Sequence, residues 1–221
     1  MRHGEVHNPE RVLYGRLPGY RLSVDGRRMA RQSAEYIKSL ERPIGALVCS
    51  PLQRTRESAE PFVELFGIEP FIDERVIEPT NVFEGKNMKR AVANPLNWRH
   101  LVRPSVPSWG EPYREVVDRM QAAMADAWTR TRHGDVVVVS HQLPIWIFHL
   151  AVLQGPLSPR PLDPALGRRA EPPAAWAQHN PAKRRCALSS VTSFEGGPGS
   201  WVEVAYAEPA VTAGAVDVGA V

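Results

Sequence analysis

The residues near the start of the chain place an imidazole beside a guanidinium. Arg2, His3 and Gly4 are consecutive. A histidine nitrogen is nucleophilic near neutral pH, a guanidinium binds phosphate oxygens with a planar fork, and a glycine lets the backbone approach a ligand closely. The triplet is therefore suited to attack on a phosphate group, although the same three residue types recur at positions 132–134.

The second copy of the triplet has a different setting. It directly follows an amphipathic pattern over residues 112–131 and precedes an apolar run over residues 135–140. Basic residues and a terminating glycine are common at the C-terminus of a helix, where the basic groups meet the negative end of the dipole. We therefore expect residues 132–134 to lie at the opposite edge of the sheet from the first triplet, without a chemical role.

Two continuous apolar runs predict strands that are buried on both faces of a parallel sheet. Residues 44–49 end at Ser50, and residues 135–140 end immediately before His141. A helical pattern follows each run, and the ligands of open α/β sheets bind at the carboxyl edge of the strands. Arg54 and His141, which follow the two runs, are therefore expected near the same edge.

Apolar periodicity predicts the other regular elements. They are helices over residues 25–40 and 112–131, and hairpin strands over residues 187–194 and 201–206. Ser108 and Glu111 have the spacing of a capping box at the start of the second helix.

The composition is that of an ordinary globular protein with one α/β domain. The chain has 221 residues, 43% hydrophobic and 23% charged, with a formal net charge of +3. The sequence contains no basic stripe with interleaved aromatic residues, so we expect no nucleic-acid partner. The two cysteines form no disulfide framework. No apolar run approaches the roughly 20 residues of a membrane span, and no signal peptide is recognisable, so we expect a cytoplasmic protein without a membrane partner.

Two segments stand apart from the predicted domain, which covers residues 1–209. Residues 156–183 are rich in Pro, Arg and Ala and have no period, which favours a surface-loop insertion. Residues 210–221 are small and weakly patterned, and we expect a disordered tail.

Several of these residues together resemble the histidine phosphatase superfamily, also called the phosphoglycerate-mutase-like family. The resemblance runs from residue 2 to about residue 155 and resumes over residues 179–209. It depends on the following residues, in this order: Arg2-His3-Gly4-Glu5, Asn8, Ser50-Pro51-Leu52-Gln53-Arg54-Thr55-Arg56, Glu78 and Ser140-His141.

The resemblance implies a three-layer α/β/α sandwich with a mostly parallel central sheet. In the family an apolar central strand runs directly into the Arg-His-Gly triplet, whereas here only Met1 precedes Arg2. The first strand is therefore apparently truncated, and we expect translation to begin upstream, with codons for a further apolar segment.

The resemblance also implies a role for each member of the set. His3 would attack phosphorus and form a phosphohistidine that water cleaves, with its other ring nitrogen bonded to a backbone carbonyl. Arg2 and Arg54 would hold the phosphoryl oxygens, and His141, if protonated, would add a third cationic donor.

The general acid implied by the family pattern is Glu78. A neighbouring phosphate should raise the pKa of this carboxyl group, because an anion disfavours its charged form. The residues around it depart from the family pattern, with Ile77 before the acid, so Glu84 and Glu74 remain alternative acids.

Three further residues are predicted to bind substrate. Asn8 matches a family position that reaches the phosphate or the substrate, and Arg16 either contacts a second anionic group or is a solvated surface residue. Gln142 replaces the glycine that commonly follows the second catalytic histidine. The other histidines have no ligand-like spacing, so we expect no metal and no cofactor.

The leading functional hypothesis is a metal-independent phosphomonoesterase that acts on a small phosphorylated metabolite. A cofactor-dependent phosphoglycerate mutase shares the whole catalytic set, but usually has a helical insertion where this chain has only the short segment 85–108. A non-catalytic phosphate-binding protein is the third possibility. The sequence leaves the substrate and the oligomeric state open.

Overall fold

A computed structural model describes residues 1–100, 110–131, 133–154 and 186–210 of the chain. The predicted loop insertion at 156–183 and all of the predicted tail at 210–221 except residue 210 lie outside these residues. Among the described residues, no helix combines the length and the apolar character that a membrane span requires.

The central sheet is parallel and has the order β2-β1-β3. Its strands are β1 (Ile44–Cys49), β2 (Pro70–Ile72) and β3 (Asp135–Val139). The register pairs Val48 of β1 with Phe71 on one side and Val138 on the other. Both strands predicted from the apolar runs are therefore confirmed, and they are neighbours in the sheet.

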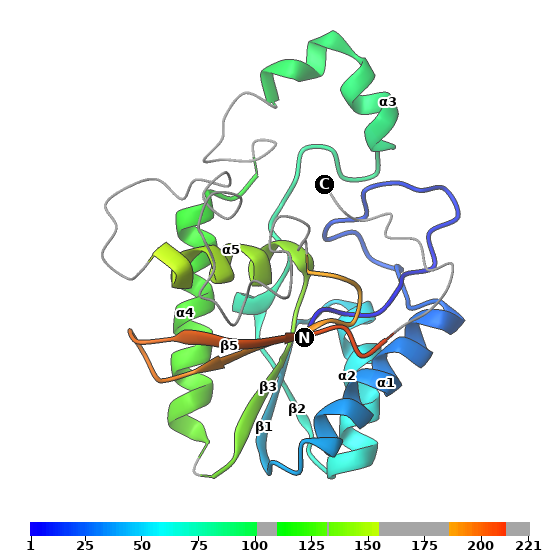
Figure 1. Ribbon diagram of the computed structural model, residues 1–221. Coiled ribbons are helices and arrows are strands. Elements are labelled where there is room, and N and C mark those ends of the chain that lie inside the picture. The colour runs from blue at the N-terminus through cyan, green and yellow to red at the C-terminus, as the bar shows by residue number, and fades with distance from the viewer. Residues whose placement is uncertain (101–109, 132, 155–185, 211–221) are drawn as a thin grey trace.

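Helices cover both faces of the sheet (Figure 1). The helices are α1 (Val24–Ser39), α2 (Gln53–Phe66), α3 (Met88–Ala93), α4 (Tyr113–Arg130) and α5 (Gln142–Gln154), with short 3₁₀ helices η1 (Glu74–Val76) and η2 (Pro95–His100). Helices α1 and α2 pack together on one face, and α4 and α5 on the other. The predicted three-layer architecture with a parallel central sheet is confirmed.

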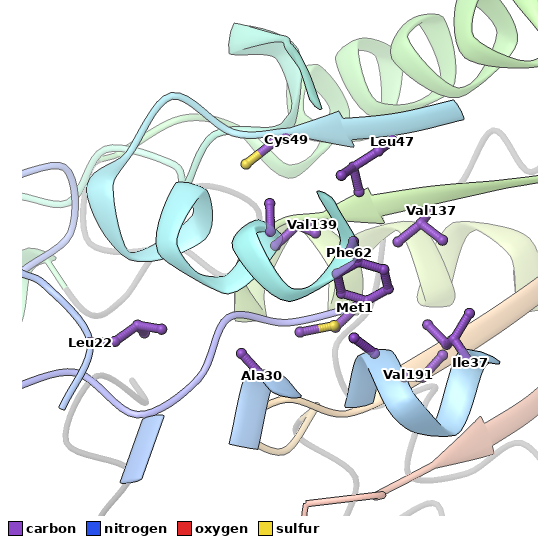
Figure 2. Packing of buried hydrophobic residues seen from close by; sticks show 12 residues of the cluster. Met1, Leu22, Ala30, Ile37, Leu47, Cys49, Phe62, Val137, Val139 and Val191 are labelled. Carbon is purple, nitrogen blue, oxygen red and sulfur yellow. The ribbon is translucent and has the colours of Figure 1, made fainter. Parts of the chain in front are cut away.

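The two faces of the sheet bury different side chains, because successive residues of a strand point in opposite directions. Leu47, Val137 and Val139 point toward α1 and α2, where they pack around Phe62 and Met1 (Figure 2). The opposite face packs against α4 and α5. The α4 residues of this second cluster recur at three- and four-residue spacing. The cluster contains Val48, Val116, Val117, Met120, Ala123, Ala127, Ile147 and Phe148. The sheet is thus anchored between two apolar cores.

The first residues of the chain lie beside the end of β3. Arg2 forms a parallel bridge with Ser140, and the His3 backbone N–H donates to the Ser140 carbonyl at 3.1 Å. On the other side, the Arg2 N–H donates to the Ser190 carbonyl at 3.0 Å, and the Ser189 N–H donates to the His3 carbonyl at 3.1 Å. Backbone hydrogen bonds on two sides therefore fix the position of His3.

The segment that flanks His3 leads into the predicted hairpin. Strands β4 (Val191–Glu195) and β5 (Val202–Ala207) pair antiparallel, as the sequence predicted. Gly196 has φ +109° between them, a conformation that side chains other than glycine rarely adopt.

Gly4 is required by packing in the fold. A Cβ atom at this position would lie 2.2 Å from the carbonyl oxygen of Gly26, in the first turn of α1. Ser23 caps that helix by accepting from the Gly26 N–H, and its hydroxyl donates to Glu5 at 2.6 Å. The glycine of the first triplet thus allows α1 to approach the residues that follow His3.

The second triplet lies where it was expected, as far as the structure describes it. Gly134 directly precedes β3 with φ +88°, whereas His141 follows the other end of that strand.

The predicted capping box of α4 is wrong: Pro112 is the N-cap residue and provides no side-chain cap, and Ser108 lies outside the described residues. Glu111 instead binds the side chain of Arg119.

Candidate active site

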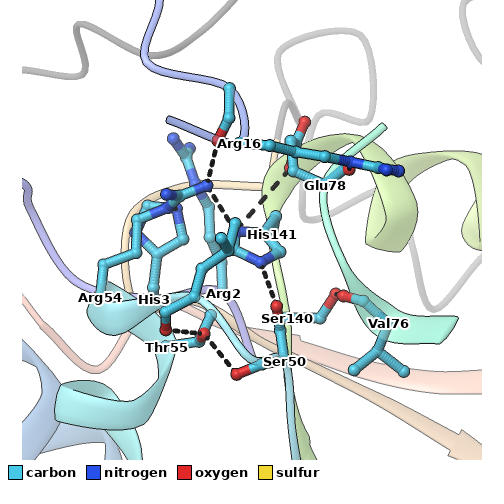
Figure 3. A network of polar contacts seen from close by, with 12 residues as sticks. Arg2, His3, Arg16, Ser50, Arg54, Thr55, Val76, Glu78, Ser140 and His141 are labelled. Carbon is cyan, nitrogen blue, oxygen red and sulfur yellow. Dashed lines mark hydrogen bonds and ion pairs between the residues drawn. The ribbon is translucent and has the colours of Figure 1, made fainter. Parts of the chain in front are cut away.

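Three of the predicted catalytic residues converge at the carboxyl edge of the sheet (Figure 3). His3 lies beside the end of β3, Arg54 belongs to the first turn of α2, and His141 lies between β3 and α5. The ring centroids of His3 and His141 are 5.3 Å apart. Residues that are distant in the sequence therefore lie side by side at this edge.

His3 has one nitrogen that is ready to act as a nucleophile. Its Nδ1 lies 2.7 Å from the carbonyl oxygen of Gly4, so Nδ1 carries the proton and donates it. Its Nε2 accepts from the Arg54 Nε–H at 3.3 Å and is unprotonated. Burial, and then the positive charges of Arg54 and Arg2, lower the pKa of His3 well below its usual value. The predicted hydrogen bond to a backbone carbonyl is confirmed.

Arg54 links the parts of the site. Its Nη2 donates to the carbonyl of Gly15 at 2.8 Å and to Nδ1 of His141 at 3.1 Å. The guanidinium lies 4.8 Å from the centre of the Tyr14 ring and is almost fully buried. Because the charge is fixed by these contacts, it needs no reorganisation when a phosphoryl group binds.

His141 is neutral in the site without substrate. Since Arg54 donates to its Nδ1, the ring proton is on Nε2, which donates to the Ser50 hydroxyl at 2.7 Å. Burial, and then the charge of Arg54, lower the pKa of His141 well below its usual value. The expected cationic form of His141 therefore requires an anion beside it, which would favour its protonation.

Arg2 brings a second guanidinium to the same edge. Its Nη1 donates to the Cys186 carbonyl at 2.7 Å, and the side chain is buried. Its charge acts on both histidines, because it contributes to the lowered pKa values of His3 and His141. The positive charge of the site thus resides on arginines, and the imidazoles stay neutral.

Glu78 lies next to His141 in the loop after η1. Its Oε2 is 3.9 Å from Nδ1 of His141, and 20% of its side chain is exposed. Burial raises the pKa of Glu78 to about 7, although nearby guanidiniums favour its charged form. The carboxyl group can therefore hold a proton near neutral pH, which is the property that a general acid needs.

The alternative acids, Glu74 and Glu84, have different surroundings. Glu74 is exposed at the start of η1. Glu84 is partly buried, and its Oε1 accepts from the Arg16 backbone N–H at 3.1 Å. Glu78 combines a raised pKa with a distance of 3.9 Å from its Oε2 to Nδ1 of His141, which favours it as the acid.

The predicted substrate-binding residues have different surroundings. Asn8 is buried, and its amide group donates to and accepts from the backbone of Val12, which shapes the loop in this state. The Nε of Arg16 donates to the Glu78 carbonyl, so Arg16 crosses the acid-bearing loop (Figure 3). Gln142 is partly buried at the first position of α5, next to His141. Their roles in binding stay predictions.

Sequence reasoning missed the residues that orient the catalytic groups. Ser50 accepts from Nε2 of His141 and so holds the ring, and Ser58 accepts from the Gly4 N–H at 3.1 Å while its hydroxyl donates to the Arg54 carbonyl at 2.7 Å. Ser50 belongs to the motif that carries Arg54, and Ser58 lies one helical turn after it. Their positions near the motif were visible, but their hydrogen bonds depend on the fold.

Taken together, the site can receive a phosphoryl group. It offers a neutral imidazole whose unprotonated Nε2 faces Arg54, two buried guanidiniums, and a carboxyl group that is partly protonated near neutral pH. These are the parts that phosphoryl transfer needs: a nucleophile, positive charge around the transferred oxygens and a proton for the leaving group. Among the described residues, no group of three His, Cys, Asp or Glu side chains is arranged to hold a metal ion.

Comparison with known proteins gives a family match for most of the chain. The family model for the histidine phosphatase superfamily (branch 1) matches residues 1–163. The chain is 39% identical to the uncharacterised protein Rv0525 of Mycobacterium tuberculosis, with 95% of each chain covered. It is 28% identical to a probable phosphoglycerate mutase, GpmB, of Citrobacter koseri, over 93% of this chain and 90% of that protein.

A solved structure shows the same fold. The mycobacterial glucosyl-3-phosphoglycerate phosphatase Rv2419c, in complex with inorganic phosphate, matches with a TM-score of 0.68. The match covers 96% of this chain and 97% of that chain, at 22% sequence identity. Of these three proteins, one is named as a phosphatase and one as a probable phosphoglycerate mutase.

Proposed function

This chain belongs to the histidine phosphatase superfamily, and we propose that it is a metal-independent phosphomonoesterase that hydrolyses a small phosphorylated metabolite through a phosphohistidine on His3. The observation that carries the proposal is the tautomer of His3. Its Nδ1–H is held by the Gly4 carbonyl, so the lone pair of Nε2 faces Arg54 and His141. A nucleophile and the charges that stabilise its product thus share one small space.

The proposed first step forms a bond from His3 Nε2 to phosphorus and breaks the bond from phosphorus to the ester oxygen. Protonated Glu78 gives its proton to that oxygen, and the alcohol leaves. In the second step water attacks phosphorus, the bond to His3 breaks, and the Glu78 carboxylate takes the proton from the water. Inorganic phosphate leaves, and the site returns to its starting state.

A mutase is the second candidate function, because GpmB is named a probable phosphoglycerate mutase.

The proposed phosphatase and the mutase differ in their products. If the protein is the proposed phosphatase, we expect it to release inorganic phosphate from a panel of small phosphate monoesters, with a metal chelator present, since no step needs a metal. The measurement compares phosphate released with isomer formed from 3-phosphoglycerate. Isomer without phosphate would support the mutase, and binding without either product would indicate a non-catalytic phosphate-binding protein.

The raised pKa of Glu78 predicts how turnover depends on pH. With a pKa of about 7 the carboxyl group is mostly protonated below pH 7 and able to donate, and it loses the proton as the pH rises. We expect kcat for an alkyl phosphate ester to fall about tenfold per pH unit above pH 7, and Glu78→Gln to lower the rate at pH 6 by roughly 10²-fold and to abolish this fall. Rates measured from pH 5 to 9 test it.

Two matched variants separate Glu78 from the other carboxylates near the site. Glu84→Gln and Glu74→Gln remove the same charge but should keep the wild-type pH profile. An unchanged pH profile in Glu78→Gln, or the loss of the alkaline fall in one of the other two variants, would assign the acid to a different residue.

A further inference from the structure

A cleft of about 480 Å³ opens beside the acid-bearing loop. Its volume lies within the roughly 300–1,000 Å³ of small-molecule sites. The residues that line it and matter here are Arg16, Ile77, Thr80, Glu111, Glu115 and Arg119. Most of these side chains are polar or charged, so the cleft is suited to a hydrophilic group.

The cleft begins where the proposed reaction releases its alcohol. Ile77 lines it and directly precedes Glu78, and Arg16, which also lines it, donates to the Glu78 carbonyl. The charge of Arg119 acts on both Glu78 and His141, so this cleft residue is close to the reacting groups. A leaving group whose ester oxygen meets Glu78 would therefore extend into the cleft.

The guanidiniums of the cleft are bound to carboxylates of the chain. Glu111 accepts from Nε and Nη2 of Arg119 at 2.6 and 3.0 Å, and from Nη2 of Arg16 at 3.3 Å. Arg75, a third cation in the lining, binds Asp73 at 2.7 Å. An anionic group of a ligand would have to compete with these carboxylates for the same donors.

Two more carboxylates reduce the attraction for an anion. Glu74 and Glu115 line the cleft with Glu111, and together they balance the charges of the three arginines. The Thr80 hydroxyl and the paired ions offer donors and acceptors to neutral hydroxyl groups, which can bind beside an ion pair without separating it.

We infer that this cleft is the leaving-group subsite of the proposed phosphatase and that it selects phosphate esters of neutral polyhydroxyl compounds, such as sugars and sugar alcohols, over esters that bear a second anionic group. Glu111 is the specificity-determining residue, because it occupies both Arg16 and Arg119. The inference depends on the proposed function for the identity of the leaving group. It replaces the earlier expectation that Arg16 either binds a second anion or is solvated.

The experiment compares sorbitol 6-phosphate with 6-phosphogluconate. Both have a six-carbon chain and the same reacting phosphate, and they differ at the far carbon, which is an alcohol in one and a carboxylate in the other. We expect the wild-type kcat/KM to be at least about tenfold higher for sorbitol 6-phosphate. Equal values, or a preference for 6-phosphogluconate, would overturn the inference.

The Glu111→Gln variant tests the stated cause. It frees Arg16 and Arg119 for a ligand, so the ratio of the two kcat/KM values should shift toward 6-phosphogluconate by about tenfold. Glu115→Gln is the charge-matched control in the same cleft, and we expect a shift of less than about threefold. Equal shifts in the two variants would remove Glu111 from its assigned role.

Binding separates a failure of this inference from a failure of the proposed function. Calorimetry on His3→Ala, which cannot form the phosphohistidine, should give tighter binding of sorbitol 6-phosphate than of 6-phosphogluconate. If this preference is present but the wild type hydrolyses no ester, including 4-nitrophenyl phosphate, the proposed hydrolysis fails and the selectivity stands. If esters are hydrolysed and the preference is absent in both assays, the selectivity alone fails.

Discussion

The His3→Ala variant is expected to lose phosphatase activity by about 10⁴-fold or more, because removal of a nucleophile leaves only binding and charge stabilisation to assist water. The substitution removes Nε2, which faces Arg54 and His141, and also the hydrogen bond from Nδ1 to the Gly4 carbonyl. The measurement is steady-state hydrolysis of 4-nitrophenyl phosphate at pH 6, with folding checked by circular dichroism.

The chain provides a matched control for this variant. His133 belongs to the second Arg-His-Gly triplet, is exposed and precedes β3 at the edge opposite to the site. We expect His133→Ala to keep the wild-type rate within about twofold, since a surface substitution away from the site changes little. A His3→Ala variant that is folded and loses less than about tenfold would refute the role of His3 as nucleophile.

The Arg54→Ala variant is expected to lose about 10³-fold in kcat/KM, at the upper end of what one donor to a developing charge contributes. Arg54 holds Nε2 of His3, Nδ1 of His141 and the Gly15 carbonyl with one planar group. Its removal therefore takes away a hydrogen bond to each histidine, as well as the proposed donors to the phosphoryl oxygens. Kinetics with 4-nitrophenyl phosphate, and phosphate binding by calorimetry, measure the loss.

Two further variants show whether charge alone is sufficient. Arg54→Lys keeps the positive charge but lacks the fork that reaches several acceptors, so we expect it to recover only a small part of the rate. Arg56→Ala removes an exposed arginine of the same motif and should leave the rate unchanged. A full recovery in Arg54→Lys would show that the geometry of the guanidinium is unimportant.

Much of the architecture followed from the sequence because the strands are short, apolar and continuous. The runs at 44–49 and 135–139 form neighbouring strands, and parallel strands bring their carboxyl ends to one edge. That rule alone placed Arg54 and His141 near each other. The position of His3 came from the family resemblance, and the structure explains it by backbone bonds to Ser140 and Ser189.

The features that the sequence did not predict depend on contacts between loops. The pairing of Glu111 with Arg16 joins residues 95 positions apart, and the pattern around Glu111 instead suggested a helix cap. The packing of Gly4 on Gly26 likewise depends on how α1 approaches the first segment. Periodicity and motif spacing report on neighbours within one element, and such long-range contacts leave no local pattern.

The neutral state of His141 was also outside the reach of the sequence. Whether an imidazole is charged depends on its burial and on the charges around it, and both are properties of the fold. Here burial and Arg54 lower the pKa of His3 and His141, while burial raises that of Glu78. The proposed nucleophile is thus kept deprotonated and the proposed acid protonated in the same pH range.

The most direct test of the central claim is to find the phosphoryl group on the protein during turnover. Wild-type protein would be mixed with excess 4-nitrophenyl phosphate, quenched within milliseconds at alkaline pH, where phosphohistidine survives, and mapped by peptide mass spectrometry. The account predicts one phosphoryl group, on His3, that is absent from His3→Ala and present in His133→Ala. Phosphate release without a phosphorylated His3, or a phosphoryl group on another residue, would contradict it.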